Sequence, residues 1–293
     1  MSAPIAVGLA GAGPWATHAL APMLAAGPET MLAAVWSRTP ATAAALAATH
    51  GVVAVESFAA LLERCEAVAF AVPPGVQAEL APLATRAGRH LLLDKPLAFD
   101  VAAAERVVEA CERAGVVTQL MLTHRYREAT AAYLASVRAA GPVAARLECL
   151  SGAFVRGPYA CAWRREYGVL HDLGPHAFDL LEAALGPIVR IRGSGDPRRT
   201  VALACEHESG APSAVMLSGV AERPATRFVL GCDVPGGTLE FDAVAASAEP
   251  PWPAVRRSFA RAVREGVPAA HDARRGLALQ RLIGRAGEAF ESH

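Results

Sequence analysis

The stretch Gly8–Ala16 reads GLAGAGPWA and holds the pattern G-x-G-x-x-A from Gly11 to Ala16. An apolar run at residues 5–10 precedes it and predicts a strand, and the alanine-rich segment 14–26 predicts a helix. At such a turn the glycines permit a tight bend and let a pyrophosphate approach the backbone, and the alanine keeps helix and strand close. The pattern predicts a dinucleotide site, with an alanine- and glycine-rich turn of biased composition as the alternative. The residues expected to line the site are Gly11, Gly13, Pro14 and Trp15.

Outward from this turn, the first 122 residues alternate short apolar runs with helical segments. Strands are expected at residues 5–10, 31–36, 52–55, 67–72, 90–94 and 116–122. Alternation of strand and helix indicates a parallel sheet with helices on both faces, and continuously apolar strands are typical of such buried sheets. We therefore predict an α/β fold whose N-terminal domain, at residues 1–122, is a Rossmann domain with a doubly wound parallel sheet.

The second half of the chain has a different order of expected secondary-structure elements. Apolar runs follow one another with turn residues and no helices between them, at residues 188–193, 200–208, 213–220, 227–232 and 238–241. Such a succession indicates an open, mainly antiparallel sheet in an α+β domain. We predict that residues 123–293 form this substrate and oligomerisation domain, and that its C-terminal helices pack back on the first domain.

Composition excludes several classes of protein. With 28 basic and 28 acidic residues the formal net charge is zero, so the basic surplus typical of a general nucleic-acid-binding protein is absent. Every stretch of 18 residues is interrupted by Gly, Pro or a charged residue, so we expect no membrane span. The six cysteines form no CxxC pair, and we expect reduced thiols in a cytoplasmic protein. No cluster has the spacing of metal ligands, so no metal site is predicted.

The choice of cofactor depends on the end of the second expected strand. An NAD enzyme usually carries Asp or Glu there to hold the ribose hydroxyls, whereas residues 35–39 read VWSRT. Ser37, Arg38 and Thr39 can all donate hydrogen bonds to a 2′-phosphate, and Arg38 can also stack on adenine. No carboxylate is present to repel that phosphate. We predict NADP, with NAD as the alternative; a helix-capping hydroxyl beside a solvated arginine would explain the same residues.

Lys95 is the single lysine of the chain, because all the other basic residues are arginine. In a chain that otherwise uses only arginine as its basic residue, a lysine indicates a position where the compact ammonium group matters, since arginine is planar and always charged. It follows the fifth expected strand, and ligands of open α/β sheets bind at the carboxyl ends of strands. Pro96 makes the turn rigid and favours extended backbone at Lys95. We predict that Lys95 belongs to the site.

A second cluster of polar residues lies at residues 168–179, GVLHDLGPHAFD. Pro175 is well placed at the first position of a helix, which puts His176 in its first turn. The positive end of the helix disfavours imidazolium, so we expect His176 to be neutral and able to accept a proton. Asp172 precedes the helix and can reach toward the same site. Taken alone, a histidine at a helix start is more often structural than catalytic.

These elements together resemble the glucose-fructose oxidoreductase/inositol dehydrogenase/MocA (Gfo/Idh/MocA) family, over nearly the whole chain. The resemblance rests on the glycine turn, on the family's E-K-P motif (here Asp94-Lys95-Pro96) and on its D-x-G-x-H-x-x-D motif. The last motif is formed by Asp172, Gly174, His176 and Asp179. Pro73 and Pro74 look like the family's nicotinamide-side loop, and residues 259–266 are similar to its C-terminal helix. Asp94 and Gln77 depart from the usual residues, which are Glu and, in many members, His.

The resemblance implies a Rossmann domain, a second domain with a large open sheet, a site between them, and oligomers built through that sheet. It implies that Lys95, Asp172 and His176 are catalytic, with Pro73, Pro74 and Lys95 on the cofactor. His176 would exchange the hydroxyl proton as hydride moves to or from NADP, Lys95 would stabilise the reacting oxygen, and Asp172 would orient the substrate or Lys95. Candidate substrate residues are Arg125, Tyr126, Trp163 and Arg164, the last two on an expected loop where Arg164 and Arg165 could clamp an anion.

Three functions remain open from the sequence. The first is an NAD(P)-dependent oxidoreductase that acts on a hydroxyl or carbonyl carbon of a sugar, cyclitol or related small molecule. The second is a glycosidase or lyase that retains its nicotinamide and shows no net redox change. The third is a non-catalytic NADP-binding regulator, against which the three acid–base residues argue. The expected partners are the small-molecule substrate and a second copy of the chain, as a dimer or tetramer, with no nucleic acid and no membrane.

Overall fold

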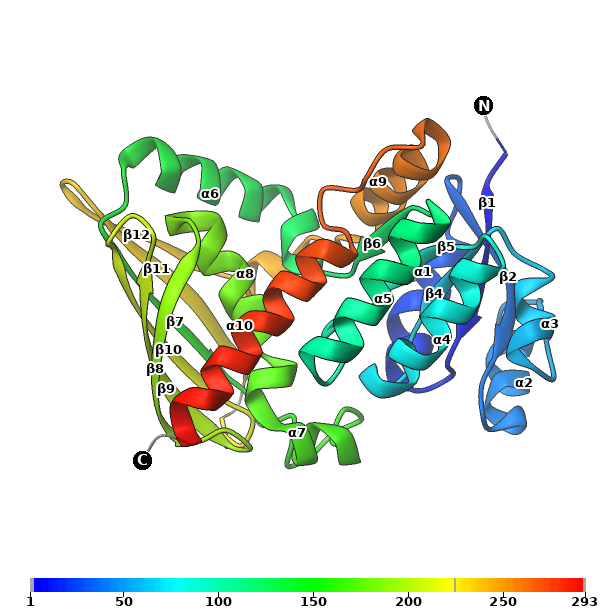
Figure 1. Cartoon of the computed structure of the whole chain (residues 1–293), viewed down its shortest axis with the longest axis horizontal. Coiled ribbons are helices and arrows are strands. Elements are labelled where there is room, and N and C mark those ends of the chain that lie inside the picture. The colour runs from blue at the N-terminus through cyan, green and yellow to red at the C-terminus, as the bar shows by residue number, and fades with distance from the viewer. Residues whose placement is uncertain (1–2, 224, 292–293) are drawn as a thin grey trace. The chain divides into compact units, whose positions relative to one another are not determined.

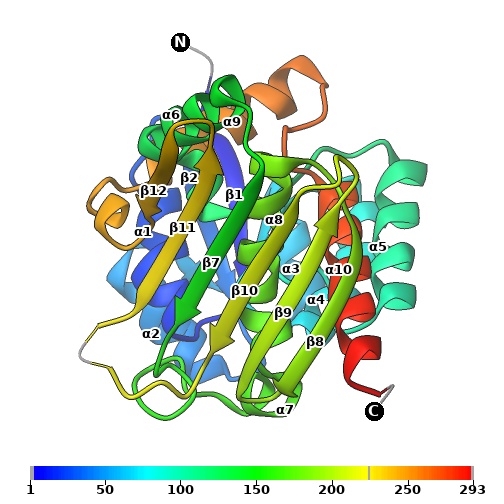
Figure 2. The same ribbon diagram turned by 90° about the vertical axis from the view of Figure 1, so that its left-hand side faces the viewer.

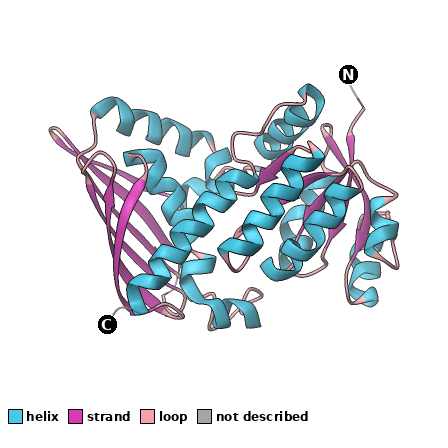
Figure 3. Ribbon diagram, viewed as in Figure 1, coloured by secondary structure: helices cyan, strands magenta, loops and turns pink. Residues whose placement is uncertain are grey.

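The computed structural model describes residues 3–223 and 225–291, and the chain divides into two compact units (Figure 1). The first unit contains the residues up to Met121 together with Trp252–Leu277. The second contains Leu122–Pro251 and the chain from Ala278 onward. Each unit has its own sheet covered by helices, as the colours of Figure 3 distinguish.

The first unit is built on a parallel six-stranded sheet in the order β3-β2-β1-β4-β5-β6. Its strands are β1 (Ile5–Ala10), β2 (Thr30–Trp36), β3 (Val53–Ala54), β4 (Ala67–Phe70), β5 (His90–Leu93) and β6 (Thr118–Leu120). The intervening helical segments are η1 (Ala16–Leu20), α1 (Ala21–Ala25), α2 (Pro40–Thr49), α3 (Phe58–Leu62), α4 (Pro74–Arg86) and α5 (Val101–Ala114). The strand order is that of a doubly wound Rossmann fold, which confirms the α/β class predicted for this part of the chain.

Local sequence explains where these elements begin and end. Every residue of β4 is buried, as expected for a parallel strand with helices on both faces. Helix α5 begins after Asp100, whose carboxylate accepts the N–H of Ala103 at 2.7 Å. It ends at Gly115, which adopts the left-handed conformation with φ of 63°.

The chain returns to the first unit near its C-terminus, in α9 (Trp252–Glu265) and the first part of α10 (Ala273–Glu291). Arg256 of α9 pairs with Glu29, with Nε and Oε2 3.1 Å apart, and donates to the carbonyl oxygen of Met23. Gln119 of β6 donates to the carbonyl oxygen of Val255 at 3.0 Å. These buried polar contacts fix α9 to the N-terminal sheet.

The second unit is built on a six-stranded sheet in the order β12-β11-β7-β10-β9-β8 (Figure 2). Its strands are β7 (Ala144–Leu150), β8 (Ile188–Asp196), β9 (Thr200–His207), β10 (Pro212–Ser218), β11 (Arg227–Val234) and β12 (Gly237–Asp242). Its helical segments are η2 (Thr123–Tyr126), α6 (Glu128–Ala140), α7 (Ala162–Asp172), α8 (Gly174–Leu185) and η3 (Ala245–Ala248). All neighbouring strands are antiparallel except β7 and β10, which confirms the mainly antiparallel sheet.

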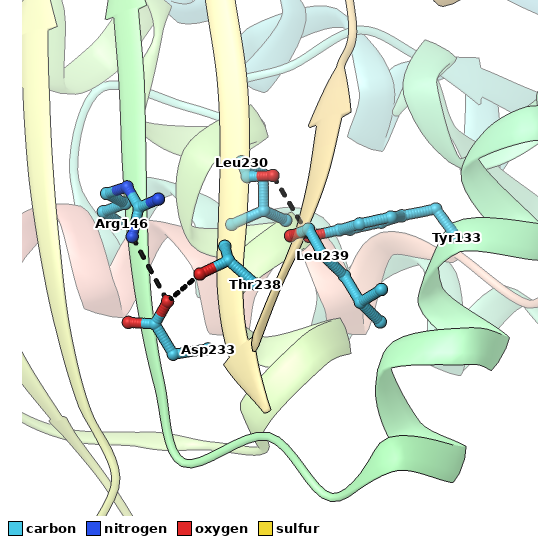
Figure 4. Close-up of polar contacts among 6 residues, drawn as sticks. All are labelled: Tyr133, Arg146, Leu230, Asp233, Thr238 and Leu239. Atoms are coloured by element: carbon cyan, nitrogen blue, oxygen red, sulfur yellow. Dashed lines mark hydrogen bonds and ion pairs between the residues drawn. The ribbon is translucent and has the colours of Figure 1, made fainter. Parts of the chain in front are cut away.

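One face of this sheet forms a core and the other meets solvent, as its alternating burial shows. Along β7 the side chains at positions 145, 147 and 149 are buried, whereas Arg146 is exposed and Glu148 half-buried. Nη1 of Arg146 lies 3.3 Å from Oδ1 of Asp233 on β11, and the same oxygen accepts a hydrogen bond from the hydroxyl of Thr238 on β12 (Figure 4). A polar network thus joins three adjacent strands on the outer face.

Helix α6 contacts the edge strand β12 and its neighbour β11 through one aromatic residue. The hydroxyl of Tyr133 lies 3.1 Å from the carbonyl oxygens of both Leu230 and Leu239 (Figure 4). Its ring stacks on Phe241, with ring centroids 5.0 Å apart. Burial raises the pKa of Tyr133, so the phenol keeps the proton that it donates to these carbonyl groups.

Helix α7 was not expected from the sequence. Trp163 and Arg164 lie in this helix, so their placement on a loop is wrong. The helix contains a kink at Gly168, with φ of 76°, where a Cβ would lie 2.2 Å from the carbonyl oxygen of Pro197. This helix is therefore fixed by a tertiary contact with the β8–β9 turn, which no local pattern signals.

Candidate functional site

The glycine turn between β1 and η1 depends on a contact that only glycine allows. Gly11 has φ of +120°, and a Cβ built there would lie 2.2 Å from the carbonyl oxygen of Ala71. Its N–H donates to the carbonyl oxygen of Trp36 at 2.7 Å. Gly11 thus packs closely between the C-terminal ends of β2 and β4, at the carboxyl edge of the sheet.

Gly13 has a different environment. A Cβ at this position would meet no atom of the described chain within 4 Å, and its φ lies outside the left-handed region. The protein's own packing therefore does not require glycine here. The open space beside the Gly13 backbone is what a pyrophosphate needs for close approach, so the residues of this turn fit a bound dinucleotide.

Pro14 and Trp15 lead into η1, which is wound as a π-helix. Trp15 packs edge-on against Trp252 of α9, with ring centroids 5.9 Å apart. Its indole Nε1 is buried and has no hydrogen-bond partner among the residues described. The Trp15 side chain therefore contributes packing, and the backbone N–H groups of the helix start remain the groups suited to phosphate.

At the end of β2 the three candidate cofactor residues differ in their availability. The hydroxyl of Ser37 donates to the carbonyl oxygen of Thr39 at 2.9 Å, accepts the N–H of Thr39 and lies 3.0 Å from the Thr42 hydroxyl. Ser37 therefore shapes the turn before α2, whereas the N-cap residue Thr39 makes no side-chain capping hydrogen bond. Arg38 and Thr39 are exposed.

Two loops at the same sheet edge carry the remaining first-unit candidates. Pro73 precedes α4 and Pro74 is its first residue, where proline suits the fixed φ of a helix start. Lys95 lies two residues after the end of β5, and its N–H donates to the carboxylate of Asp94 at 2.8 Å. The loop after Lys95 is anchored in the core by Leu97, which is 1% exposed.

Sequence reasoning named Gln77 only as a departure from the family and gave it no function. Its side chain is 1% exposed and hydrogen-bonds to the main chain around Lys95. The signal for this was present in the sequence, because Gln77 shares the buried face of α4 with Pro74, Ala81 and Ala84. A polar residue on such a face needs a partner for its amide.

In the second unit Asp172 is paired with Arg164. The Asp172 Oδ2 and the Arg164 Nε are 3.0 Å apart, and the two side chains are 7% and 18% exposed. Arg164 also donates to the carbonyl oxygen of Tyr159 and lies over the ring of Trp163. Burial lowers the pKa of Arg164, but Asp172 and Cys161 raise it above its ordinary value. Arg164 thus neutralises Asp172.

His176 lies in the first turn of α8, as the sequence predicted. Only Leu173 separates α7 from α8, and its N–H donates to the carbonyl oxygen of Val169 at 2.8 Å. Helical hydrogen bonding therefore continues from one helix to the next, so the positive helix end expected beside His176 is reduced.

His124 of η2, which the sequence did not single out, contacts the ring of His176. The two rings meet edge-on with centroids 5.1 Å apart, and His124 also packs on Phe228 at 4.8 Å. Its Nδ1 lies 3.2 Å from Nη1 of Arg127, which can only donate. Nδ1 of His124 must therefore accept, which leaves the ring proton of the neutral imidazole on Nε2.

The candidate substrate residues Arg125 and Tyr126 also lie in η2. Arg125 pairs with Asp179 of α8 at 3.1 Å, and Asp179 is 1% exposed. Asp179 and His176 lie three positions apart on α8 and therefore share a face. The Arg125–Asp179 pair thus fixes η2 to the helix of His176, and Tyr126, at 9% exposed, is mostly buried.

The described part of the chain contains no group of three or more His, Cys, Asp or Glu side chains arranged to hold a metal ion. None of the described helices has the length and apolar character needed to cross a bilayer. The six cysteines form no disulfide bond.

Comparison with known proteins adds family evidence to this geometry. Residues 5–122 match the model of the Gfo/Idh/MocA oxidoreductase family, described as having an NAD-binding Rossmann fold. The dTDP-3,4-didehydro-2,6-dideoxy-alpha-D-glucose 3-reductase of Streptomyces violaceoruber is 32% identical over 197 residues, or 64% of this chain. The matched region spans 56% of that relative's length.

Two solved structures share the fold. GenD2 from gentamicin A biosynthesis, solved with NAD, aligns over 100% of this chain and 95% of its own, with a TM-score of 0.88 and 20% identity. The scyllo-inositol dehydrogenase of Lactobacillus casei, solved with NAD(H) and scyllo-inositol, aligns over 98% and 97%, with a TM-score of 0.86 and 16% identity. Residues 5–122 thus match the Gfo/Idh/MocA oxidoreductase family, and both units of the chain share the fold of these two solved structures.

Proposed function

We propose that the protein is an oxidoreductase that transfers hydride between a nicotinamide cofactor, NADP in preference to NAD, and a hydroxyl or carbonyl carbon of a sugar, cyclitol or related small molecule. The observation that carries this proposal is the glycine turn, where Gly11 is required by the fold and Gly13 leaves room that the protein itself does not use. The curated relative named above acts on a nucleotide-linked sugar, which supports a carbohydrate substrate.

The protein's own residues then supply binding and proton transfer, while the bound nicotinamide supplies or accepts the hydride. In the oxidative direction His176 accepts the hydroxyl proton of the substrate, and in the reductive direction it returns that proton to the carbonyl oxygen. Lys95 donates a hydrogen bond to the same oxygen and stabilises its negative charge. Asp172 orients the substrate or the Lys95 ammonium group, and Arg164 holds the Asp172 carboxylate in place.

NADP preference rests on Arg38 and Thr39, because Ser37 is occupied within its own turn. Fluorescence titration of the purified protein with NADPH and NADH, after removal of any bound nicotinamide, tests this choice. We expect tighter binding of NADPH, and a loss of that preference in Arg38→Ala. Tighter binding of NADH by the unchanged protein would reverse the cofactor assignment and leave the family and the Lys95 and His176 roles intact.

The oxidoreductase assignment is tested by a screen of keto sugars, sugars and cyclitols at 340 nm, followed by Lys95→Ala and His176→Ala. Each variant should lose at least about 100-fold in turnover, as removal of an acid–base or oxyanion group does, with cofactor affinity nearly unchanged. Full activity in both variants would refute the residue assignment. A nicotinamide that co-purifies and never exchanges would instead favour the closed redox cycle of a glycosidase or lyase.

We also propose that the protein works as a cytoplasmic homo-oligomer whose copies meet through the outer face of the second sheet. Support comes from the family resemblance and from that face, which presents a polar network and exposed Met216. Sedimentation of the protein with and without Met216→Arg tests it, because a charge at a buried interface should dissociate the oligomer.

A further inference from the structure

One side chain of α4 hydrogen-bonds to the main chain of the loop that carries Lys95. Gln77 is separated from this loop by the rest of α4 and by β5, yet its carboxamide contacts the loop on both sides of the lysine. The Oε1 atom accepts the N–H of Asp94 at 2.8 Å. The Nε2 atom lies 2.8 Å from the carbonyl oxygen of Asp94 and 3.0 Å from that of Leu97, with the carbonyl oxygen of Pro96 at 3.4 Å.

The carboxamide suits this position because it has an acceptor and two donor hydrogens at one end. One amide can therefore satisfy the N–H and the carbonyl group of the same residue, Asp94, in the manner of a neighbouring strand. The second amide hydrogen serves the carbonyl group of Leu97. Glutamate in place of Gln77 would direct lone pairs at three carbonyl oxygens, and leucine would leave these buried groups without the amide.

The loop is also fixed on its other side. Leu97 is buried against Gly276 of α10, where a Cβ would lie 3.1 Å from the Leu97 side chain. Asp100 then caps α5, which ends the loop. Between these anchors the main chain at Lys95 is set by Gln77 on one side and by the Asp94 carboxylate, which accepts the Lys95 N–H, on the other.

We propose that Gln77 is a positioning residue for Lys95: its carboxamide fixes the main chain on both sides of the only lysine, and so sets the place of the ammonium group. The importance of that ammonium group for catalysis rests on the proposed function. Its placement does not, because it can be measured without a substrate.

The experiment uses the fact that the chain has one lysine. Reductive methylation of the whole protein with ¹³C-formaldehyde gives one dimethyl-lysine NMR signal and one from the α-amino group, which Lys95→Arg distinguishes. The pH titration and line shape of the lysine signal then report the surroundings of Lys95 directly. Gln77→Leu is the test variant and Gln119→Leu is the matched control, because Gln119 is equally buried in the same unit and its amide contacts Val255 instead of the loop.

We expect Gln77→Leu to move or broaden the Lys95 signal and to change its titration, whereas Gln119→Leu leaves it as in the unchanged protein at a similar loss of Tm. Once a substrate is known, turnover of Gln77→Leu should fall on the order of 10- to 100-fold, as a small misplacement of a catalytic group does, with cofactor affinity within about twofold. Gln77→His and Gln77→Asn keep a donor and an acceptor and should restore part of both readouts.

Identical Lys95 signals in Gln77→Leu, Gln119→Leu and the unchanged protein would overturn the proposal. Where Gln77→Leu does not fold, Gln77→Asn and Gln77→His decide it by the same spectrum, since a passive anchor would leave the Lys95 titration unmoved in both. A shifted Lys95 signal together with full turnover by Lys95→Ala would refute the catalytic role of the lysine and leave the positioning by Gln77 standing.

Discussion

The Lys95 loop of the first unit and the Asp172–His176 segment of the second are fixed by different forces. Around Lys95 the main chain is held mostly by neutral hydrogen bonds with the Gln77 amide, and the Asp94 carboxylate is the one charged acceptor among these contacts. Around Asp172 and His176 they are charged, through the Arg164–Asp172 and Arg125–Asp179 pairs. Neutral hydrogen bonds are insensitive to salt and pH, whereas a buried ion pair depends on both of its members. The two halves of the candidate machinery should therefore fail in different ways.

The largest effect should come from the glycine turn, which belongs to the neutral half. Gly11→Ala forces a Cβ to within 2.2 Å of the Ala71 carbonyl oxygen, so we expect a loss of about 4 kcal/mol or more in the free energy of unfolding of the cofactor-free protein. Gly13→Ala meets no atom and should leave that stability within about 0.5 kcal/mol. Gly13→Ala should nevertheless weaken nucleotide binding by more than about tenfold. Urea unfolding and fluorescence titration measure the two effects, and equal stability losses in the two variants would contradict the geometry.

The charged half is tested by Arg164→Leu. Removal of this guanidinium leaves the buried Asp172 carboxylate without its cation, and we expect a loss of about 3 kcal/mol in the free energy of unfolding. Arg190→Leu is the control, because its pair with Glu206 is exposed and should contribute less than about 1 kcal/mol. Urea unfolding of both variants at low and high salt would show whether burial separates them, and a similar loss in each would remove the contrast.

A smaller effect is expected where the second unit uses a neutral contact. Tyr133→Phe removes the hydroxyl that serves two carbonyl groups and should cost about 1 kcal/mol. The loss should be local, so hydrogen exchange should become faster in β11 and β12 and remain unchanged in the first sheet. Uniform acceleration over the whole chain would argue against a local role for Tyr133.

The smallest effect concerns pH in the first unit. Burial lowers the pKa of His90, although Glu66 opposes this, and Nδ1 of His90 accepts the N–H of Val117 at 3.0 Å. The unfolded chain therefore binds a proton on His90 more readily than the folded chain does. Neutral His90 thus favours the folded state above about pH 6.5, and this stabilisation declines as the pH falls below that value. His90→Asn keeps an acceptor without the titration, and its Tm should fall less between pH 7.5 and pH 5.5 than that of the unchanged protein.

The sequence predicted much of the fold because its signals are local. The glycine turn, the continuously apolar strands and the change of rhythm after residue 122 all reflect short-range constraints, and both sheets follow from them. Helix α7 was missed because it depends on Gly168 packing against the β8–β9 turn. The pairing of Arg164 with Asp172 was missed for the same reason, since a solvated arginine and a buried one look alike in a sequence.

The catalytic roles of Lys95, Asp172 and His176 stay a prediction. A strand end singled out Lys95, a helix start singled out Asp172 and His176, and the family resemblance joined the three. The residues that hold them were not found, because His124 and Gln77 act through contacts with elements distant in the chain. Of these two, only Gln77 could have been found from the sequence, as a polar side chain on the apolar, buried face of α4.

The contact of Trp15 with Trp252 gives the glycine turn an optical property. Two indole rings with centroids 5.9 Å apart and planes inclined by 63° are close enough for their electronic transitions to couple. Coupled chromophores in a fixed, asymmetric arrangement produce a paired band of opposite signs in circular dichroism. Because Trp15 follows the turn directly, a dinucleotide that settles beside Gly13 would alter this band, and the protein would report occupancy of its own turn without any added label.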